Sequence, residues 1–467
     1  AAGVDKDGRL LAKDMHSYSN QGAYASHGHA IAANGLTSWR LQYACPNIRG
    51  EAYTIYTNTP VGGAMRGYGI PQVCFAIESF MDDVANEIHM DPLEFRRKNL
   101  IQGYYEDAYL KPIAANTNGI FECLEKGAEY IHWDEKRKEY AEQTGDVRKG
   151  VGMALFSYKT GVWPISLEIA GARLSLNQDG SVQLMLGATE IGQGADTVFS
   201  QMVAETLHTD MEHVHIKTVQ DTDVSPFDTG AYASRQSFVT GTAVRHCAEI
   251  LRDKILAYAK TLLPEIDTRE LTLKDNWIWA GDEQAISLAA LAEESYYSLT
   301  NSSVLTAEVS EQVKKNTIAT GCCFAEVEVD IKLGKIKILH IINVHDSGKL
   351  LNPQLAEMQV HGGMSMGMGY GISEQLILDE KTGRPLNGNL LDYKLMTMLD
   401  TPDIKADFVE LCDPMGPYGN KALGEPPAIP CAPAIRNAVL HATGVAFYEN
   451  PLTPQRLIDG FQKAGLI

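Results

Sequence analysis

Two kinds of hydrophobic spacing alternate along this chain, and together they constrain its fold more than any other feature of the sequence. Apolar residues alternate with polar ones on both sides of the turn Asn177-Gln-Asp-Gly180, which is typical of a β-hairpin. Apolar residues at helical spacing occupy 71–90, 198–207 and 242–263 instead. Since strand pairs and helices are interleaved, we expect an α+β fold with mixed sheets and packed helices.

The remaining elements follow from the same two patterns. Residues 1–60 are predicted to be mostly strands and turns, and alternation around Gly334 predicts a second hairpin. Further helices are expected at 92–97, at 434–442 and from residue 454, because capping residues followed by proline open the first and the last of them.

The length of 467 residues allows two or three domains at about 150 residues each. A polar run at 135–149 interrupts the hydrophobic patterns and is typical of a solvated helix face and linker. We therefore predict one unit over residues 1–145 and a second over residues 146–467.

The charge of the chain limits its partners. Its 40 basic and 59 acidic residues give a net charge of −19, and an acidic surface repels phosphate backbones. Nucleic acid is therefore not an expected partner. A membrane is not expected either, because no stretch approaches the ~20 apolar residues that a spanning helix needs.

The eight cysteines include no Cys-x-x-Cys pair, so the chain has no zinc-ribbon or iron–sulfur signature. Scattered thiols suit a reducing cytoplasm, where buried cysteine acts as a small hydrophobe. The His-x-His pairs that begin at His27 and His213 lack the further ligands of a zinc site, so we expect no metal there.

Two glycine motifs each allow two interpretations. Gly192-Gln-Gly194 opens a predicted helix, where bare amides suit an anion or a polar heterocycle, but a tight strand-to-helix turn has the same form. Gly363-Met-Ser365-Met-Gly367 matches a nucleophile elbow only formally. The small residues of 361–371 suggest a helix or loop packed close to something planar, with ordinary core packing as the alternative.

Two loops carry polar groups suited to chemistry. In Gly424-Glu-Pro-Pro427 the prolines are expected to restrict Glu425 to extended backbone angles and to hold its carboxylate as a general base requires. A plain surface turn has the same sequence form. In 63–72, Arg66 could bind an anion and Tyr68 could stack on an aromatic ring.

Seven segments together resemble the molybdenum-binding subunit of the xanthine dehydrogenase/aldehyde oxidase family of molybdenum hydroxylases. Each motif is short, but their order and spacing match the family along nearly the whole chain. The segments are Pro46-Asn-Ile-Arg-Gly50, Ala64-Met-Arg-Gly-Tyr-Gly-Ile-Pro-Gln72, Arg96-Arg-Lys-Asn-Leu100, Thr189-Glu-Ile-Gly-Gln-Gly194, Ala233-Ser-Arg-Gln236, Leu351-Asn-Pro353 and Gly424-Glu-Pro-Pro427.

The resemblance implies oxidative hydroxylation of an N-heteroaromatic substrate with oxygen from water, and a purine such as xanthine or hypoxanthine is expected. It implies molybdenum held by the dithiolene of molybdopterin, in its cytosine dinucleotide form, with no protein side chain on the metal. An iron–sulfur subunit with [2Fe-2S] clusters and an FAD subunit are the expected partners. Residues 1–145 would be the C-terminal part of the first molybdopterin-binding domain, and 146–467 the second.

The resemblance also implies roles for single residues. Glu425 falls on the catalytic base of the family, and Arg66 lies in the loop that lines the metal centre. Tyr68 falls on an aromatic residue that flanks a flat substrate. The implied cofactor-binding residues are Ala64, Met65, Gly192, Gln193, Gly194, Ala233, Ser234, Gln236 and Gln359.

The sequence departs from the family in two respects. The arginine that purine-oxidising members carry falls near Asn34, where this chain has none, and a ring-flanking phenylalanine falls near Val162 and Trp163. Asn34 and Val162 are therefore the expected substrate-binding residues at these places. The family loop Gly-Gly-Gly-Phe-Gly is absent, so we expect a preceding segment or another chain to complete the site. The alternatives are an aldehyde or nicotinate-type pyridine hydroxylase and a non-catalytic scaffold half of a split subunit.

Overall fold

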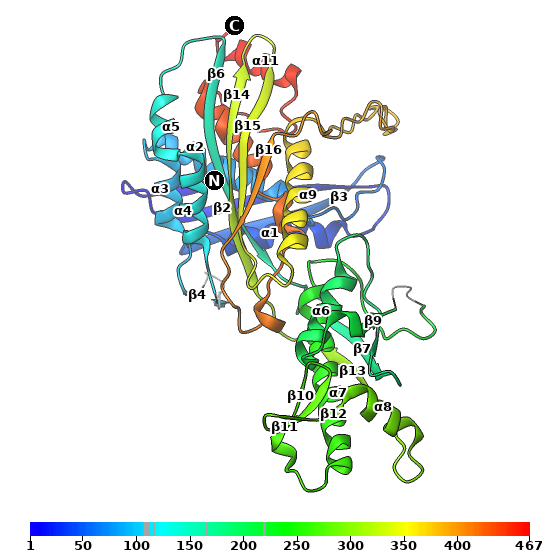
Figure 1. Ribbon diagram of the computed structural model, residues 1–467. Coiled ribbons are helices and arrows are strands. Elements are labelled where there is room, and N and C mark those ends of the chain that lie inside the picture. The colour runs from blue at the N-terminus through cyan, green and yellow to red at the C-terminus, as the bar shows by residue number, and fades with distance from the viewer. Residues whose placement is uncertain (107–111, 115–116, 165, 218–220) are drawn as a thin grey trace.

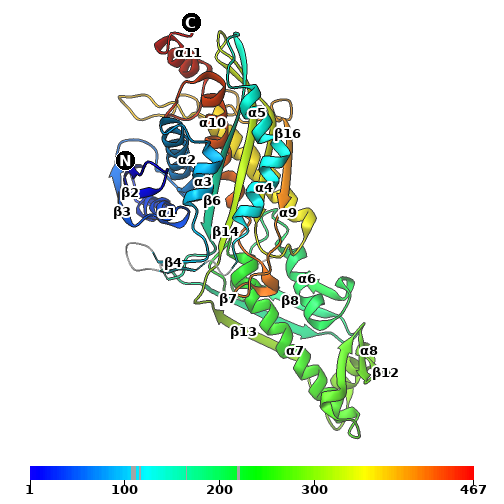
Figure 2. The same cartoon turned by 90° about the vertical axis from the view of Figure 1, so that its left-hand side faces the viewer.

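A computed structural model describes residues 1–106, 112–114, 117–164, 166–217 and 221–467 of the chain. It has two lobes, and the larger one carries both chain termini (Figure 1). The smaller lobe is built from the elements between β7 and β13 and extends away from the larger one in both views (Figure 2). Mixed sheets with packed helices confirm the predicted α+β class.

A four-stranded sheet runs through the larger lobe in the order β16–β15–β14–β6. Its long antiparallel strands β14 and β15 form the hairpin predicted around Gly334, and β16 joins β15 in parallel. The strands are β6 (Val147–Lys159), β14 (Ile318–Asp330), β15 (Lys335–Asp346) and β16 (Asp403–Phe408).

Helices cover both faces of this sheet, because alternate residues of one strand face opposite sides. Met153 and Phe324 belong to a core shared with α2 (Ile70–Glu87), α3 (Pro92–Asn99), α4 (Ile120–Ile131) and α5 (Trp133–Glu139). Ala154 and Cys323 belong to a second core with α9 (Pro353–Ile372), α10 (Cys431–Thr443) and α11 (Pro454–Lys463).

The first 60 residues differ in part from their predicted form. They contain the sheet of β1 (Ala2–Val4), β2 (Leu10–Gly22) and β3 (Asn47–Tyr56), as expected, but also the helix α1 (Gly28–Leu41). Glycine and asparagine weaken the helical signal of this stretch. A Cβ at Gly35 would lie 3.0 Å from the carbonyl oxygen of Gly69. Gly35 therefore weakens the helical pattern of the sequence and at the same time lets α1 pack against the start of α2.

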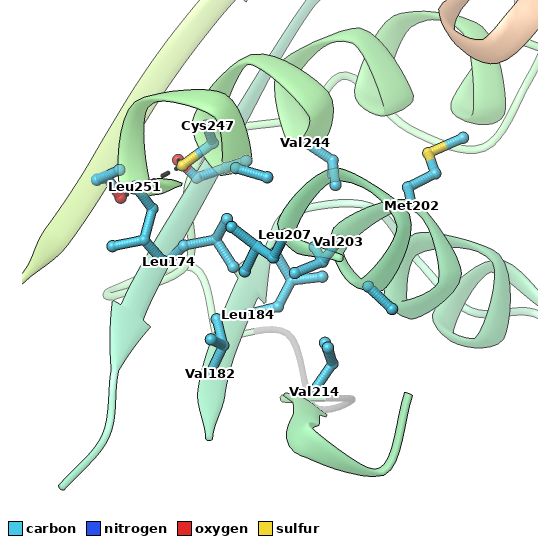
Figure 3. Packing of buried hydrophobic residues seen from close by; sticks show 14 of the residues in the cluster. Leu174, Val182, Leu184, Met202, Val203, Leu207, Val214, Val244, Cys247 and Leu251 are labelled. Atoms are coloured by element: carbon cyan, nitrogen blue, oxygen red, sulfur yellow. Dashed lines mark hydrogen bonds between the residues drawn. The ribbon is translucent and has the colours of Figure 1, made fainter. Parts of the chain in front are cut away.

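The smaller lobe has a core of its own. The hairpin of β7 (Ile169–Leu176) and β8 (Val182–Leu186) lies between β13 (Thr306–Gln312) and β9 (Val214–Ile216), which confirms the hairpin predicted at 177–180. The helices α6 (Ala195–Leu207) and α7 (Gly241–Leu262) pack on this sheet. Figure 3 shows leucines and valines of both layers meeting there, among them Leu174, Leu184, Leu207 and Leu251.

Short elements complete the described chain: β4 (Tyr104–Glu106), β5 (Pro112–Ala114), β10 (Leu271–Lys274), β11 (Trp277–Ala280), β12 (Glu283–Ser287) and α8 (Leu288–Tyr297). Among the helices of the described ranges, none combines the length and the apolar character needed to cross a bilayer. The division of the chain at residue 145 stays a prediction. In space, residues on both sides of that point share the core that contains Met153 and Phe324.

Candidate active site

The loop that carries Glu425 differs from its predicted form. Glu425 has helical backbone angles, φ −92° and ψ −37°, at the start of the 3-10 helix Pro426–Ala428, so the prediction of extended angles is wrong. Its N–H donates a hydrogen bond to Ser234 Oγ at 2.9 Å. A residue before proline disfavours the helical region, and here the tertiary contacts of the loop override that local preference.

The glycines of α9 show how this loop is held. A Cβ at Gly363 would lie 2.4 Å from Pro427 Cβ, and one at Gly367 would lie 2.7 Å from the carbonyl oxygen of Ala428. The close approach predicted for these small residues is thus made, at Gly363 and Gly367, to the Glu425 loop. Ser365 lies within this helix, so the formal nucleophile motif does not form an elbow.

The Glu425 carboxylate is held by neutral donors. Tyr158 Oη donates to Glu425 Oε2 at 2.6 Å, and the Gly67 N–H donates to the same oxygen at 3.1 Å. Burial raises the pKa of Glu425, while the hydrogen bonds of Tyr158, Gly67 and Ala233 and the charge of Arg66 lower it in part. The net pKa lies above the ordinary value, as suits a carboxylate that must accept a proton near neutral pH.

Arg66 links the Glu425 loop to α9. Its Nε donates to the carbonyl oxygen of Gly424 at 2.6 Å, and its Nη2 donates to the carbonyl oxygen of Gln359 at 2.8 Å. Burial lowers the pKa of the guanidinium, although the nearby Glu425 raises it in part. The structure thus brings Arg66 together with two predicted site residues from far along the chain, since Gln359 lies 293 positions away and the loop of Glu425 begins at Gly424, 358 positions away.

Tyr68 lies in a strained turn beside α1. Gly67, Tyr68 and Gly69 all have positive φ, which costs a tyrosine of the order of 1 kcal/mol or more. Asn34 Nδ2 donates to the carbonyl oxygen of Tyr68 at 2.9 Å, and the Tyr68 hydroxyl lies 2.7 Å from His27 Nδ1. Asn34 of α1 therefore contacts the backbone of the predicted substrate-binding residue Tyr68, and His27, which immediately precedes α1, contacts its hydroxyl.

The side-chain amides of Gln193 and Gln236 form a pair in the smaller lobe. Gln193 Nε2 donates to Gln236 Oε1 at 2.6 Å, and both residues donate to the carbonyl oxygen of Thr189. Two predicted cofactor-binding residues are thus in direct contact, and they are fixed against one backbone atom.

The amides of the Gly192-Gln-Gly194 turn already have an anionic partner. Glu190 Oε1 accepts hydrogen bonds from the N–H groups of Gly192 at 2.6 Å and Gly194 at 3.1 Å, and its Oε2 accepts one from Asp196 at 3.1 Å. These amides help to keep the pKa of Glu190 below its ordinary value against the opposing effect of burial. The tight strand-to-helix turn is thus the better interpretation of this motif, since its own carboxylate occupies the helix N-terminus.

The segment of Ala233 and Ser234 has an unusual backbone. Both residues have φ of +49°, in the left-handed region. The next residue, Arg235, is fully buried and donates to Glu168 and Asp228, each at 2.6 Å. This buried ion-pair triad fixes the backbone on which Ser234 meets the Glu425 loop.

The other predicted positions lie around these contacts. Ala64 and Met65 are exposed, with 60% of Met65 accessible. The N–H of Val162 donates to the buried carboxylate of Glu168, so Val162 is tied to the same triad as Arg235. Its role in substrate binding stays a prediction.

Three residues of this region were missed from the sequence: Tyr158, Glu190 and Arg235. Tyr158 lies in a strand whose neighbours are nearly all buried, and nothing in its spacing marks the hydroxyl. Glu190 and Arg235 lie inside segments that resemble the family. The signal that could have found them was a charged residue next to the glycine turn, in the case of Glu190, and within a polar loop, in the case of Arg235.

Across the ranges that the structure describes, no three His, Cys, Asp or Glu side chains gather as a possible metal site. All eight cysteines are free thiols, and Cys412 is the exposed one.

Comparison with known proteins gives the family. A family profile described as a molybdopterin cofactor-binding domain matches residues 126–402, and a second one with the same description matches residues 1–100. The xanthine dehydrogenase molybdenum-binding subunit of Escherichia coli O157:H7 is 47% identical over 470 residues, which cover all of this chain and 62% of that relative. The chain belongs to the family of molybdopterin cofactor-binding domains.

Other members of the wider group are more distant. The aldehyde oxidoreductase molybdenum-binding subunit PaoC of Escherichia coli O157:H7 is 27% identical over 463 residues, covering 98% of this chain and 59% of the relative. The crystal structure of quinoline 2-oxidoreductase from Pseudomonas putida 86 superposes with a TM-score of 0.91 at 24% identity, over 99% of this chain and 61% of that one. This likeness confirms the fold. The chain thus spans about 62% of the length of the xanthine dehydrogenase subunit that it matches.

Proposed function

We propose that this chain forms the larger part of the molybdenum-binding subunit of a molybdenum hydroxylase that oxidises a purine. The observation that carries the proposal is the half-buried Glu425 carboxylate, which is held next to Arg66 by neutral donors and has a raised pKa. Such a group is suited to take a proton from an oxygen that attacks an electron-poor carbon.

The residues present fit the implied molybdopterin. Gln193, Gln236 and Gln359 offer amides that both donate and accept hydrogen bonds, as the edge of a pterin ring requires. We propose that they hold the cofactor, in its cytosine dinucleotide form, together with the backbone of Ala64, Met65, Ala233 and Ser234. When bound, this cofactor would supply a molybdenum centre that accepts two electrons from the substrate.

The chain's own residues then have separate tasks. Glu425 accepts the proton, and its half-buried position limits competition from water. Arg66 keeps its charge close to that carboxylate while it fixes the loop through the carbonyl of Gly424. Tyr68 flanks a flat substrate, and Asn34 and Val162 lie at positions that bear on substrate choice.

The substrate class rests on the relatives. The chain is 47% identical to a xanthine dehydrogenase subunit and 27% identical to an aldehyde oxidoreductase subunit, which favours a purine over an aldehyde. An aldehyde or pyridine hydroxylase remains the second candidate, because Asn34 and Val162 depart from the purine-oxidising pattern.

We propose that electrons leave through an iron–sulfur subunit with [2Fe-2S] clusters and an FAD subunit, in the cytoplasm. We further propose that a segment bearing Gly-Gly-Gly-Phe-Gly completes the site, with residues 1–145 and 146–467 as parts of the first and second molybdopterin-binding domains. Mass spectrometry of all chains in the native complex tests these partners, and a complex without that glycine loop would contradict them.

The decisive experiment measures turnover of purines, aldehydes and nicotinate by the assembled enzyme with an artificial electron acceptor. We expect purine turnover, a molybdenum content near one per subunit, and a fall of about 10²–10⁴-fold in kcat for Glu425→Gln. If the enzyme contains no molybdenum under full cofactor supply, the chain is a non-catalytic scaffold. Undiminished turnover by Glu425→Gln would rule out Glu425 as the general base.

A further inference from the structure

The two oxygens of the Glu425 carboxylate are not equivalent. Tyr158 Oη at 2.6 Å and the N–H of Gly67 at 3.1 Å both end on Oε2. The backbone N–H of Ala233 also acts on this carboxylate. The bonds of Tyr158 and Gly67 anchor Oε2 twice, and Oε1 carries neither of them.

Tyr158 is well placed to act as an anchor. It lies in β6, where its backbone is paired with Ala319 of β14, and its side chain is 2% exposed. The phenol is thus fixed by the central sheet and not by a loop. Burial, and then the charge of Glu425, raise the pKa of Tyr158 well above its ordinary value, so the hydroxyl keeps its proton and stays a donor.

We propose that Tyr158 is a positioning residue: its hydroxyl holds Oε2 of Glu425 and thereby selects Oε1 as the oxygen that takes up the proton. The proposal rests on the proposed function of Glu425 as the base. A hydrogen bond to an ionised group is stronger than one between neutral groups, so the anchor also favours the ionised form. Arg66 and Tyr68 are the other titratable groups that act on this carboxylate.

The first test is Tyr158→Phe in the assembled enzyme, which removes the hydroxyl and keeps the ring. We expect kcat to fall about tenfold or more, because hydrogen bonds to charged groups contribute at that level. KM should stay within about twofold, and the acidic limb of the kcat profile should move to higher pH. An unchanged acidic limb would overturn the proposal.

The matched control is Tyr43→Phe. Tyr43 is also buried and donates to a buried carboxylate, Glu78 Oε1, at 2.8 Å, but it lies in the core behind α2. Loss of this hydroxyl should lower the stability without moving the pH profile. If both variants move the profile equally, a general loss of packing explains the result and Tyr158 has no special role.

A second readout does not need a loaded enzyme. In the cofactor-free subunit, the unfolding equilibrium is compared for the parent, Tyr158→Phe, Glu425→Leu and the double variant at a pH where Glu425 is ionised. We expect Tyr158→Phe to change the unfolding constant about tenfold more in the parent than beside Leu at position 425. Equal effects in both backgrounds would overturn the anchor. Coupling without purine turnover would keep the anchor and reject the proposed function.

Discussion

Two glutamates of this protein, the buried Glu78 and the half-buried Glu425, have opposite surroundings. Glu78 on α2 receives hydrogen bonds on both oxygens, from Gln42 and Tyr43 on one and from Arg96 and the N–H of Leu155 on the other. At Glu425 the hydrogen bonds of Tyr158 and Gly67 both end on Oε2, and both donors are neutral. The Glu78 carboxylate is thus saturated within the core, whereas Oε1 of Glu425 carries neither of those two bonds, as suits the base proposed above.

The two arginines nearby differ in the same way. Arg96 is fully buried and pairs directly with Glu78 at 2.9 Å and with Asp82 at 2.6 Å. Arg66 lies close to Glu425, but its hydrogen bonds go to the carbonyl oxygens of Gly424 and Gln359. In the core, the charge of Arg96 is neutralised by direct ion pairs with carboxylates. At the Glu425 loop, the charge of Arg66 acts on Glu425 without a direct hydrogen bond, so that carboxylate is not tied up in an ion pair.

The largest expected effect on stability comes from removing the buried cation beside Glu78. Arg96→Met would leave Glu78 and Asp82 buried without their cation, which costs about 3–5 kcal/mol of stability when one partner of a buried pair is removed. Arg66→Met should cost about 1 kcal/mol, since it removes hydrogen bonds to neutral carbonyl groups. Urea unfolding of both variants measures the difference, and equal losses would remove the distinction between the two regions.

The next effect tests how α9 holds the Glu425 loop. Gly367→Ala places a Cβ 2.7 Å from the carbonyl oxygen of Ala428 and 2.9 Å from Cys431 Cβ, so α9 and the Glu425 loop must separate. We expect a loss of about 1–3 kcal/mol, as for other overpacked sites. Gly362→Ala is the control on the same helix, because its Cβ would meet only Arg66 Nη1 at 3.6 Å. That variant should gain stability through helix propensity.

The pH dependence of stability tests the surroundings of Glu425 in another way. The pKa of Glu425 is higher in the folded protein than its ordinary value of 4.5. As pH rises through 4.5, the unfolded glutamate ionises before the folded one, so folding loses stability until the pH has passed the folded pKa. The Glu425→Gln variant, which cannot ionise, should therefore gain stability relative to the parent over this window. Parallel stability curves against pH would contradict the raised pKa.

The smallest effect tests the support of Tyr68. Asn34→Ala removes one hydrogen bond to the Tyr68 carbonyl and should cost about 0.5–1.5 kcal/mol. If Asn34 acts by positioning Tyr68, KM for the substrate should rise several-fold at nearly constant kcat. Thr37→Ala on the same helix removes an exposed hydroxyl and is the matched control. A large change in kcat for Asn34→Ala would point to a direct part in the reaction.

Local patterns predicted the elements whose signal lies within one stretch of sequence. The hairpins at 177–180 and around Gly334, and the helix that begins after Asp91, follow from alternation and from capping. The helix α1 was missed, because the glycine at position 35 serves the contact with α2 and not the helix itself. The helical angles of Glu425 were missed for a related reason, since Ser234 lies 191 residues away.

The sequence by itself determined the α+β class, the family and the residue types of the site, because hydrophobic periodicity and the order of short motifs are properties of the linear chain. Only the tertiary structure decided which oxygen of Glu425 is anchored and that the glycines of α9 lie against the Glu425 loop. Each of these depends on atoms from distant segments meeting within about 3 Å. No local spacing encodes such a meeting, because it is set by how the two layers of helices pack on the central sheet.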